Sequence, residues 1–334
     1  MMISRVAENC FWLGRYVERA DTFARILAVN RLHILDSDLQ EGRSWKPVVI
    51  VSGEQKRFEE LLGAGAYEDV EKSEEYLTWD ERNAASIFRS FSGARENART
   101  TREVVSREVW ETINSAWRWL NEAEARREYN KDRQQFFARI RSTCAEFHGH
   151  CHDTMLHEEA FNFLRLGAWI ERAGQTARIM DVKHHWLVPR GSAEYESPQE
   201  SAQWMGLLRL CSAVEPFFKR HISAPTGSRV VQFLLQDAGF PRSVLYSLTR
   251  VEAYISSINV QANAGQANAT QRLAQDTVQR LGKADFRHLS GEQLHQTLTE
   301  VIEASAAIYQ RAADDYFDIQ LDQSEGAGRQ TESA

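Results

Sequence analysis

The stretch that most constrains this chain is residues 13–26, LGRYVERADTFARI, because a similar stretch, LGAWIERAGQTARI, follows at residues 166–179. The offset is 153 residues, and the Leu-Gly, Glu-Arg-Ala and Ala-Arg-Ile positions are the same in both copies. Apolar residues recur in each copy at the spacing of one face of an α-helix. This spacing therefore predicts two similar amphipathic helices. Their apolar positions are Leu13, Val17, Ala20, Ala24 and Leu27 in the first, and Leu166, Ile170, Ala173, Ala177 and Met180 in the second.

A polar flank accompanies the apolar face of both helices. A glycine inside a helix costs about 0.5–1 kcal/mol relative to alanine, so it predicts either a neighbouring backbone in close approach or open space above the carboxylate. Glu18 is expected to reach partners on its own helix, namely Arg15, Asp21 or Arg25. Arg19 is expected to face elsewhere. The flank consists of Gly14, Glu18, Asp21 and Arg25, matched by Gly167, Glu171, Gly174 and Arg178.

Two further blocks repeat in the same order. Trp45 and the apolar residues after it match Trp204 at an offset of 159, and segment 77–91 matches segment 234–248 at an offset of 157. Three ordered blocks at nearly one offset predict a tandem duplication of a unit of roughly 155 residues. The predicted units are residues 1–157 and 158–322, packed as one body, followed by a disordered polar tail at 323–334.

Helical periodicity dominates both units, so the expected fold is an all-α bundle of antiparallel helices. Residues 189–198 are expected to form a surface loop, and Pro241 is expected in the first turn of a helix. The predicted helices are 5–36, 44–51, 54–63, 70–78, 84–91, 93–121 and 131–157 in the first unit, and 159–187, 200–221, 228–237, 241–262, 265–282 and 290–319 in the second.

Composition narrows the function classes. A net charge of −7 and a pI near 5.9 argue against general binding to nucleic acids or anionic membranes. No apolar run approaches the roughly 20 residues that a membrane span needs. The four cysteines form no regular framework and are expected to be reduced thiols in the cytoplasm.

The two Glu-Arg helices leave two interpretations open. Glu18 and Glu171, with the arginines beside them, can line a central pocket for a charged ligand, a divalent metal or the end of a partner's peptide. Alternatively, each glutamate forms a buried ion pair with an arginine on a neighbouring helix and fixes the register of the helices.

A second group of charges lies in residues 94–103. Arg95, Arg99 and Arg102 follow helical spacing and share one stripe, and Glu96 and Glu103 form a parallel one. Clustered guanidinium groups suit bidentate binding of phosphate or carboxylate. The second unit does not keep these arginines. Such asymmetry is expected if only one half retained a functional site after duplication. The other interpretation is a solvated face or a layer of salt bridges between helices.

Cys144, His148, Cys151 and His152 have a spacing that permits metal ligation on one helix face. No second group of ligands completes the set, so ordinary core and surface roles are favoured. The sequence contains no glycine-rich phosphate loop, nucleophile elbow, HExxH motif or dinucleotide fingerprint. No metal site and no cofactor are assigned.

At the Glu-Arg helices the chain resembles the bacterial alpha-E family, an all-helical domain of unknown function with a conserved Glu-Arg motif. The resemblance spans nearly the whole chain and includes segments 13–21, 94–99, 110–111, 163–173, 204–208 and 240–244. Ala84 departs from a usual proline, and Gly174 from a common aspartate. The resemblance implies a cytoplasmic protein encoded beside a circularly permuted ATP-grasp protein and a transglutaminase-like protease, a setting for peptide- or amide-bond formation.

The leading functional prediction is an accessory subunit without catalysis of its own, which binds such a ligase or its acidic peptide product. The alternative is an enzyme in which Glu18 or Glu171 provides general acid–base chemistry on an anionic substrate. A metal-dependent version would need a divalent ion at the carboxylates or at the Cys/His group. The candidate binding residues are Arg19, Asp21, Arg25, Arg95, Glu96, Asn97, Arg99, Arg102, Arg172, Arg178 and Arg242.

Overall fold

The computed structural model describes residues 4–36, 45–187, 198–261, 267–286 and 291–317, and these residues form helices and no strand. The all-α prediction is therefore confirmed for this part of the chain. The expected tail at 323–334 lies outside the described residues, as does the expected loop at 189–198 except for Pro198, the first residue of a helix.

The helices follow in the order α1 Ser4–Asp36, α2 Lys46–Ser52, α3 Gln55–Leu62, the short 3₁₀ helix η2 Ala64–Glu68, α4 Val70–Thr78, α5 Ile87–Thr100, α6 Arg107–Leu120, α7 Ala123–Lys131, α8 Arg133–Thr154, α9 Glu159–Leu187, α10 Pro198–Leu210, α11 Val214–Arg220, α12 Gly227–Gln236, α13 Val244–Gln261, α14 Ala269–Lys283, α15 Gly291–Ala312 and the π-helical turn η3 Ala313–Phe317.

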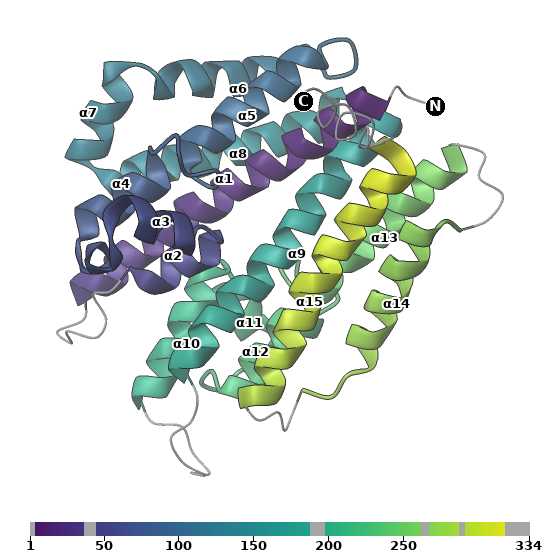
Figure 1. Ribbon diagram of the computed structural model, residues 1–334. Coiled ribbons are helices and arrows are strands. Elements are labelled where there is room, and N and C mark those ends of the chain that lie inside the picture. The colour runs from purple at the N-terminus through teal and green to yellow at the C-terminus, as the bar shows by residue number, and fades with distance from the viewer. Residues whose placement is uncertain (1–3, 37–44, 188–197, 262–266, 287–290, 318–334) are drawn as a thin grey trace, which may run out of the picture.

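The two Glu-Arg helices, α1 and α9, pack against each other at the centre of the molecule (Figure 1). Their predicted apolar positions are all buried, from Leu13 to Leu27 in α1 and from Leu166 to Met180 in α9. Two of the five positions in each helix are alanines, and small side chains let two helix axes approach closely. The apolar spacing read from the sequence therefore builds the central helix pair.

Each central helix has an equivalent arrangement of three neighbouring helices. Helices α5 and α8 pack against α1, and α6 packs against both of them; α13 and α15 pack against α9, and α14 packs against both of those (Figure 1). The shorter helices α2 and α10 contact α9 as well. Both halves thus join one packed body through α1 and α9. The duplication of the units stays a prediction.

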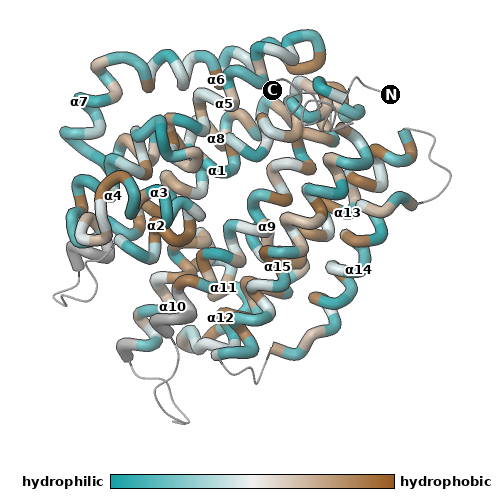
Figure 2. The backbone as a smooth tube through the Cα atoms, in the orientation of Figure 1, coloured by the Kyte–Doolittle hydropathy of each residue, from teal (hydrophilic) through white to brown (hydrophobic). Residues whose placement is uncertain are grey.

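Hydrophobic residues recur along the helices between hydrophilic ones instead of filling a whole helix (Figure 2). This is the pattern of helices that bury one face and leave the other in water. Among the described helices, none combines the length and the apolar character that crossing a bilayer requires.

Three helix predictions in the first unit are wrong. The predicted break near residue 92 does not occur, because α5 runs from Ile87 to Thr100. The predicted helix 93–121 is instead interrupted at 101–106, where Ser106 accepts a hydrogen bond from the Val109 amide and starts α6. Helix α7 was not predicted, and Asp132 caps the next helix, α8, by accepting from the Gln135 amide.

Two predictions in the second unit also need correction. The predicted helix 200–221 is divided into α10 and α11, and Ser212 between them adopts a φ of 50°, which no α-helix can contain. Pro241 lies before α13 and not in its first turn, because Ser243 caps that helix by accepting from the Tyr246 amide. This cap places Arg242 just outside the helix.

Candidate functional site

The spacing of glycine and glutamate that α1 and α9 share has a direct structural cause. A Cβ atom on Gly14 would lie 1.9 Å from the carbonyl oxygen of Leu164, and one on Gly167 would lie 2.0 Å from the carbonyl oxygen of Phe11. Each glycine therefore touches the backbone of the other helix. Of the two explanations for the glycines, close backbone approach is confirmed.

This close approach lets the two Glu-Arg pairs exchange partners across the helix interface. Arg172 of α9 donates two hydrogen bonds to Glu18 of α1, at 2.7 and 2.5 Å. Arg19 of α1 donates two to Glu171 of α9, at 2.8 and 3.1 Å. Both carboxylates are buried, with relative exposures of 0% and 2%. The interpretation of buried inter-helix ion pairs is thus confirmed.

The prediction that Glu18 pairs with Arg15, Asp21 or Arg25 on its own helix is wrong. Arg15 instead donates to Glu171 at 2.8 Å. The glycine contacts bring the two helices close together, so arginines of the facing helix reach each carboxylate. Arg19, expected to face elsewhere, faces that same neighbouring helix.

The Glu18 side contains a second carboxylate. Arg242 lies 3.3 Å from Glu18 and donates to Asp21 at 2.7 Å, so it bridges the two acids. Asp21 also accepts from Arg25 at 2.9 Å. His148 of α8 places Nε2 3.4 Å from the Glu18 carboxylate. We call this group the Glu18 cluster: Glu18, Asp21, Arg25, His148, Arg172 and Arg242.

The Glu171 side is built from different partners. Glu171 accepts from Arg15, Arg19 and the amide of Gln175, the last at 3.0 Å. Arg178 lies near enough to Glu171, Arg15 and Arg19 for all three charges to act on it, yet it makes no hydrogen bond or ion pair with any described residue. We call Arg15, Arg19, Glu171, Gln175 and Arg178 the Glu171 cluster.

Both glutamates are held in their charged form. Burial by itself would raise the pKa of Glu18, but Arg172, His148 and Arg242 hold that pKa well below its ordinary value. Burial acts in the same direction on Glu171, and Arg19 and Arg15 outweigh it, so its pKa is also lowered. Neither carboxyl has the pKa near neutrality that suits a general acid or base.

The arginines of the two clusters respond differently to burial. Burial and the nearby Arg242 lower the pKa of Arg25 to about 10, although Asp21 opposes the change. Burial also lowers the pKa of Arg178, Glu171 opposes this effect, and Arg15 and Arg19 add to it. Burial works against the charge of Arg19 too, but Glu171 raises its pKa.

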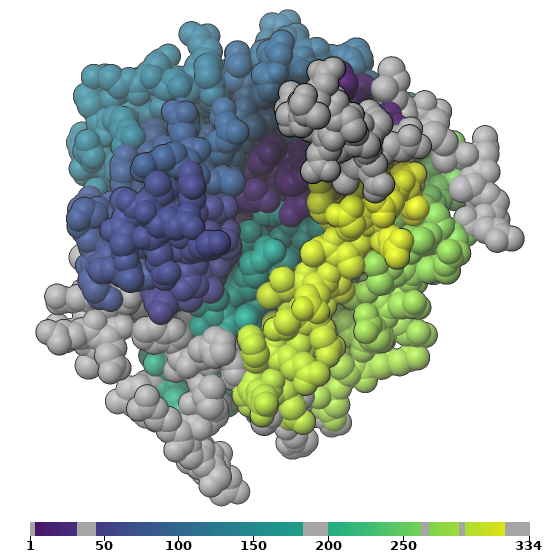
Figure 3. All heavy atoms as spheres, in the orientation of Figure 1, coloured from purple at the N-terminus to yellow at the C-terminus, as the bar shows by residue number. Residues whose placement is uncertain are grey.

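The Glu171 cluster lies at a hollow in the surface. Figure 3 shows the molecule hollowed between the blue segment α2–α5 and the yellow helix α15, with purple α1 and teal α9 at the floor. The half-buried ring of Tyr16 meets Gly93 of α5, and the guanidinium carbon of Arg15 lies 5.2 Å from the ring centre of Tyr309 in α15. Two neighbouring residues of α1 therefore reach opposite walls of the hollow, Tyr16 at α5 and Arg15 at α15.

The predicted arginine stripe of residues 95–102 lies elsewhere. Arg95 donates to Asn114 at 3.0 Å and stacks on Trp117 of α6, and Arg102 stacks on Trp110. Arg99 pairs with Glu96 on the exposed surface at 2.6 Å. Asn97 is half-buried on the same helix. Among the described residues, no hydrogen bond or ion pair links this stripe to either glutamate.

The Cys/His group does not converge on one point. Cys144 and Cys151 are buried, and burial raises the pKa of both thiols. His152 is exposed and lies 3.0 Å from Asp153, while His148 turns to Glu18. The described residues contain no group of three or more His, Cys, Asp or Glu side chains arranged to hold a metal ion.

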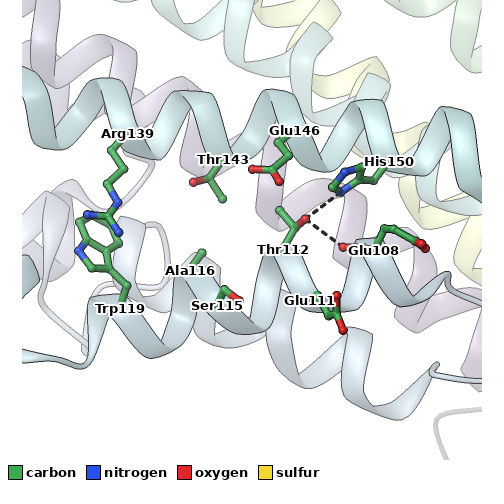
Figure 4. A pocket seen from close by; sticks show the side chains of 10 residues that line it. All are labelled: Glu108, Glu111, Thr112, Ser115, Ala116, Trp119, Arg139, Thr143, Glu146 and His150. Carbon is green, nitrogen blue, oxygen red and sulfur yellow. Dashed lines mark hydrogen bonds between the residues drawn. The ribbon is translucent and has the colours of Figure 1, made fainter.

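A separate pocket of about 410 Å³ lies between α6 and α8 (Figure 4). Thr112 donates to the Glu108 carbonyl and lies 2.9 Å from His150 Nδ1, and the Arg139 guanidinium carbon lies 4.1 Å from the Trp119 ring centre. Glu108, Glu111 and Glu146 give its lining an acidic character. The sequence singled out none of these residues as a site, and neither Glu-Arg pair lines the pocket.

Three members of the clusters escaped sequence reasoning. Arg15 was given the wrong partner, His148 was assigned to the Cys/His group, and Gln175 was not considered. The signal for Gln175 was present, because it lies one helical turn from Glu171. Arg15 bonds to Glu171 across the helix interface, so no spacing within α1 indicates that contact. His148 comes from another helix, and no spacing in the sequence indicates its contact with Glu18.

The reciprocal Glu-Arg pairs agree with the comparison against protein families, in which residues 2–317 match alpha-E, a predicted alpha-helical domain with a conserved ER motif. The chain belongs to the alpha-E family. Two Glu-Arg pairs of this chain, Glu18-Arg19 on α1 and Glu171-Arg172 on α9, exchange partners across the helix interface.

Relatives of this alpha-E chain occur in mycobacteria. An uncharacterised protein of Mycobacterium bovis and two of Mycobacterium tuberculosis strains are each 24% identical to it over 340 residues, covering 93% of this chain and 36% of theirs. The alpha-E chain therefore spans about a third of the length of these curated relatives. No solved structure matches it.

Proposed function

We propose that this alpha-E protein is an accessory, non-catalytic binding subunit of a system that forms peptide or amide bonds. The observation that carries the proposal is the state of the two glutamates. Each is buried, charged and bonded to arginines from the other central helix. Such carboxylates hold two helices in register and leave no proton to exchange at neutral pH.

The binding role rests on the Glu171 cluster. It contains three guanidinium groups and one carboxylate, and it lies in the hollow between α5 and α15 (Figure 3). An excess of arginine in a partly dry hollow favours an anionic ligand or the acidic end of a partner's peptide. The proposed partners are the circularly permuted ATP-grasp protein and the transglutaminase-like protease that the family resemblance implies, in the cytoplasm.

Two further observations support a module that acts beside another protein. The mycobacterial relatives continue well beyond the matched region, so in them the alpha-E body is part of a longer chain. In addition, both halves surround their Glu-Arg helix with the same set of neighbours. We infer from this that the halves are copies of one unit of which only the second glutamate's side became a binding surface.

Co-purification tests the proposal. The chain is expressed with each of the two proposed partners, an ATP-grasp protein and a transglutaminase-like protease from the same organism, and complexes are isolated through a tag on the partner. We expect at least one stable complex, weakened by the double substitution Arg19→Gln/Arg178→Gln in the hollow and unchanged by the surface substitution Arg107→Gln. If neither partner is retained by a chain whose helicity is normal by circular dichroism, the accessory role is wrong.

A further inference from the structure

The two clusters are built on matching positions, and comparing them shows what one of them lacks. At the offset of 153 residues, Arg25 matches Arg178 and Asp21 matches Gly174. Arg25 is bonded to Asp21 at 2.9 Å. Arg178 has a glycine where that aspartate would be, and it makes no hydrogen bond or ion pair with a described residue.

Each glutamate has a second arginine beside it, in addition to the arginine of the exchanged Glu-Arg pair. For Glu18 this is Arg242, which precedes the cap of α13. The residue that precedes the matching cap of α5 is Ala85, which carries no charge. Arg15 supplies the second cation to Glu171 instead. The Glu171 cluster is therefore complete in its cations, and the group it lacks is a carboxylate.

There is space for that carboxylate. A Cβ atom on Gly174 would lie 3.5 Å from Arg178 Nη1 and 3.9 Å from the Ser305 Cβ, which are ordinary contact distances. The Oε1 atom of Gln175, one residue further along α9, is buried without a hydrogen-bond partner. The position beside Gly174 therefore accommodates a Cβ atom without a clash and has polar groups around it.

We propose that this position is a binding site for a single carboxylate group, which a peptide ligand supplies through its C-terminus or through an acidic side chain, and which Arg178 holds as Arg25 holds Asp21. This deepens the proposed function, since it rests on the Glu171 cluster being the binding surface. The charge of the surroundings favours a carboxylate over a phosphate. Glu54, between α2 and α3, acts on Arg19 from the wall of the hollow and would repel a doubly charged group.

The aromatic rings nearby fit the remainder of a peptide. Trp12 and Tyr309 lie with ring centres 5.5 Å apart, and the guanidinium carbon of Arg15 is 4.8 Å from the Trp12 ring centre. Half-buried rings of this kind offer apolar contact area next to a charged anchor. The ligand class is therefore a peptide end or a short acidic peptide.

Calorimetric titration of the full chain tests the proposal with three probes: the dipeptide Ala-Ala, the amide of Ala-Glu, and inorganic phosphate. The first carries only a C-terminal carboxylate and the second only a side-chain carboxylate, so they distinguish the two sources. We expect at least one peptide to bind, with phosphate at least tenfold weaker. Arg178→Gln should weaken the peptide about tenfold or more, because it removes a charge-assisted hydrogen bond.

The decisive variant is Gly174→Asp, which supplies the missing carboxylate from the chain itself. It should abolish peptide binding and raise the melting temperature above that of Gly174→Ala, the control that adds only a Cβ and should still bind. Since Gly174→Asp is expected to be more stable, its loss of binding does not reflect unfolding.

Three outcomes would overturn the carboxylate site: no binding of either peptide at millimolar concentration, phosphate binding as tightly as the peptides, or unchanged binding by Gly174→Asp. None of them touches the accessory role, which co-purification tests separately. A complex retained by a chain that binds no carboxylate would refute the site alone.

Discussion

The Glu18 and Glu171 clusters use the same Glu-Arg exchange and end in different electrostatic states. Around Glu18, Asp21 and Arg242 form an additional ion pair, and Arg25 is bonded to Asp21. Around Glu171 that pair has no counterpart among the described residues. Arg15, Arg19 and Gln175 bond to the carboxylate, and Arg178 makes no hydrogen bond or ion pair with a described residue. This difference indicates that the Glu-Arg exchange joins the two helices in both clusters. The residue at the next position of the flank, Asp21 in α1 and Gly174 in α9, decides whether the following arginine has a carboxylate partner within its own helix.

The largest expected effect comes from removing the carboxylates. Glu171→Gln removes the carboxylate to which both Arg15 and Arg19 bond, and the described residues offer these two arginines no other ion pair. After Glu18→Gln, the bridging Arg242 still has Asp21. We expect Glu171→Gln to lower the free energy of unfolding by about 3–5 kcal/mol, and Glu18→Gln to lower it by less. Urea titration followed by circular dichroism measures both. If both substitutions were neutral, the exchanged pairs would not join the helices.

The next effect tests the glycine contacts that both clusters share. Gly14→Ala and Gly167→Ala would each place a Cβ atom about 2 Å from a carbonyl oxygen of the facing helix, so the helices must separate. We expect a loss of about 3 kcal/mol for either one. Gly149 on α8 is the matched control, because nothing lies within 4 Å of its Cβ position, and Gly149→Ala should stabilise the chain by about 0.5–1 kcal/mol. Equal melting temperatures for all three variants would contradict the close backbone contacts at Gly14 and Gly167.

A smaller effect compares the second cations. Arg242→Gln removes contacts to two carboxylates, Glu18 and Asp21, which then repel each other; Arg15→Gln removes contacts to Glu171 alone. We expect a cost of about 2 kcal/mol for Arg242→Gln and a lower one for Arg15→Gln. Chemical denaturation of the two variants side by side gives the order, and the reverse order would show that the two clusters are not matched in this way.

The smallest effect is a pH dependence confined to the Glu18 cluster. Burial lowers the pKa of His148, an effect that Glu18 opposes and that Arg165 and Arg172 reinforce. The folded chain therefore binds fewer protons there than the unfolded chain, so this stability is present above the ordinary histidine pKa of 6.5 and is lost as the pH falls through the folded value. Melting temperatures between pH 7.5 and 5 should fall less steeply for His148→Gln. An unchanged slope would exclude His148 as the source.

Much of the fold followed from local patterns, and the errors show where those patterns end. The buried faces of α1 and α9 were predicted residue by residue, since a 3.6-residue period dictates which side chains share a face. The break between α5 and α6 was missed because no glycine or proline marks it: Ser106 starts α6 by capping it, after a run with four β-branched residues, Thr100, Thr101, Val104 and Val105. The division at Ser212 did have a signal, because Pro216 lies within the predicted helix 200–221 and is found in the first turn of α11.

The sequence by itself determined that two Glu-Arg helices exist, which apolar side chains share their buried face, and that each glutamate lies on the same flank as a glycine. The structure then showed that Gly14 and Gly167 contact a neighbouring backbone. It could not determine which arginine each glutamate binds. An arginine one turn away on the same helix and an arginine on a facing helix are both possible partners, and the distance between the helices decides between them. Only the tertiary structure decided that Glu18 meets Arg172 and Arg242, that His148 belongs with them, and that the stripe from Arg95 to Arg102 packs against tryptophans elsewhere. The physical reason is that ion pairs depend on separations of a few ångströms between side chains far apart in the chain, and helix packing sets those separations.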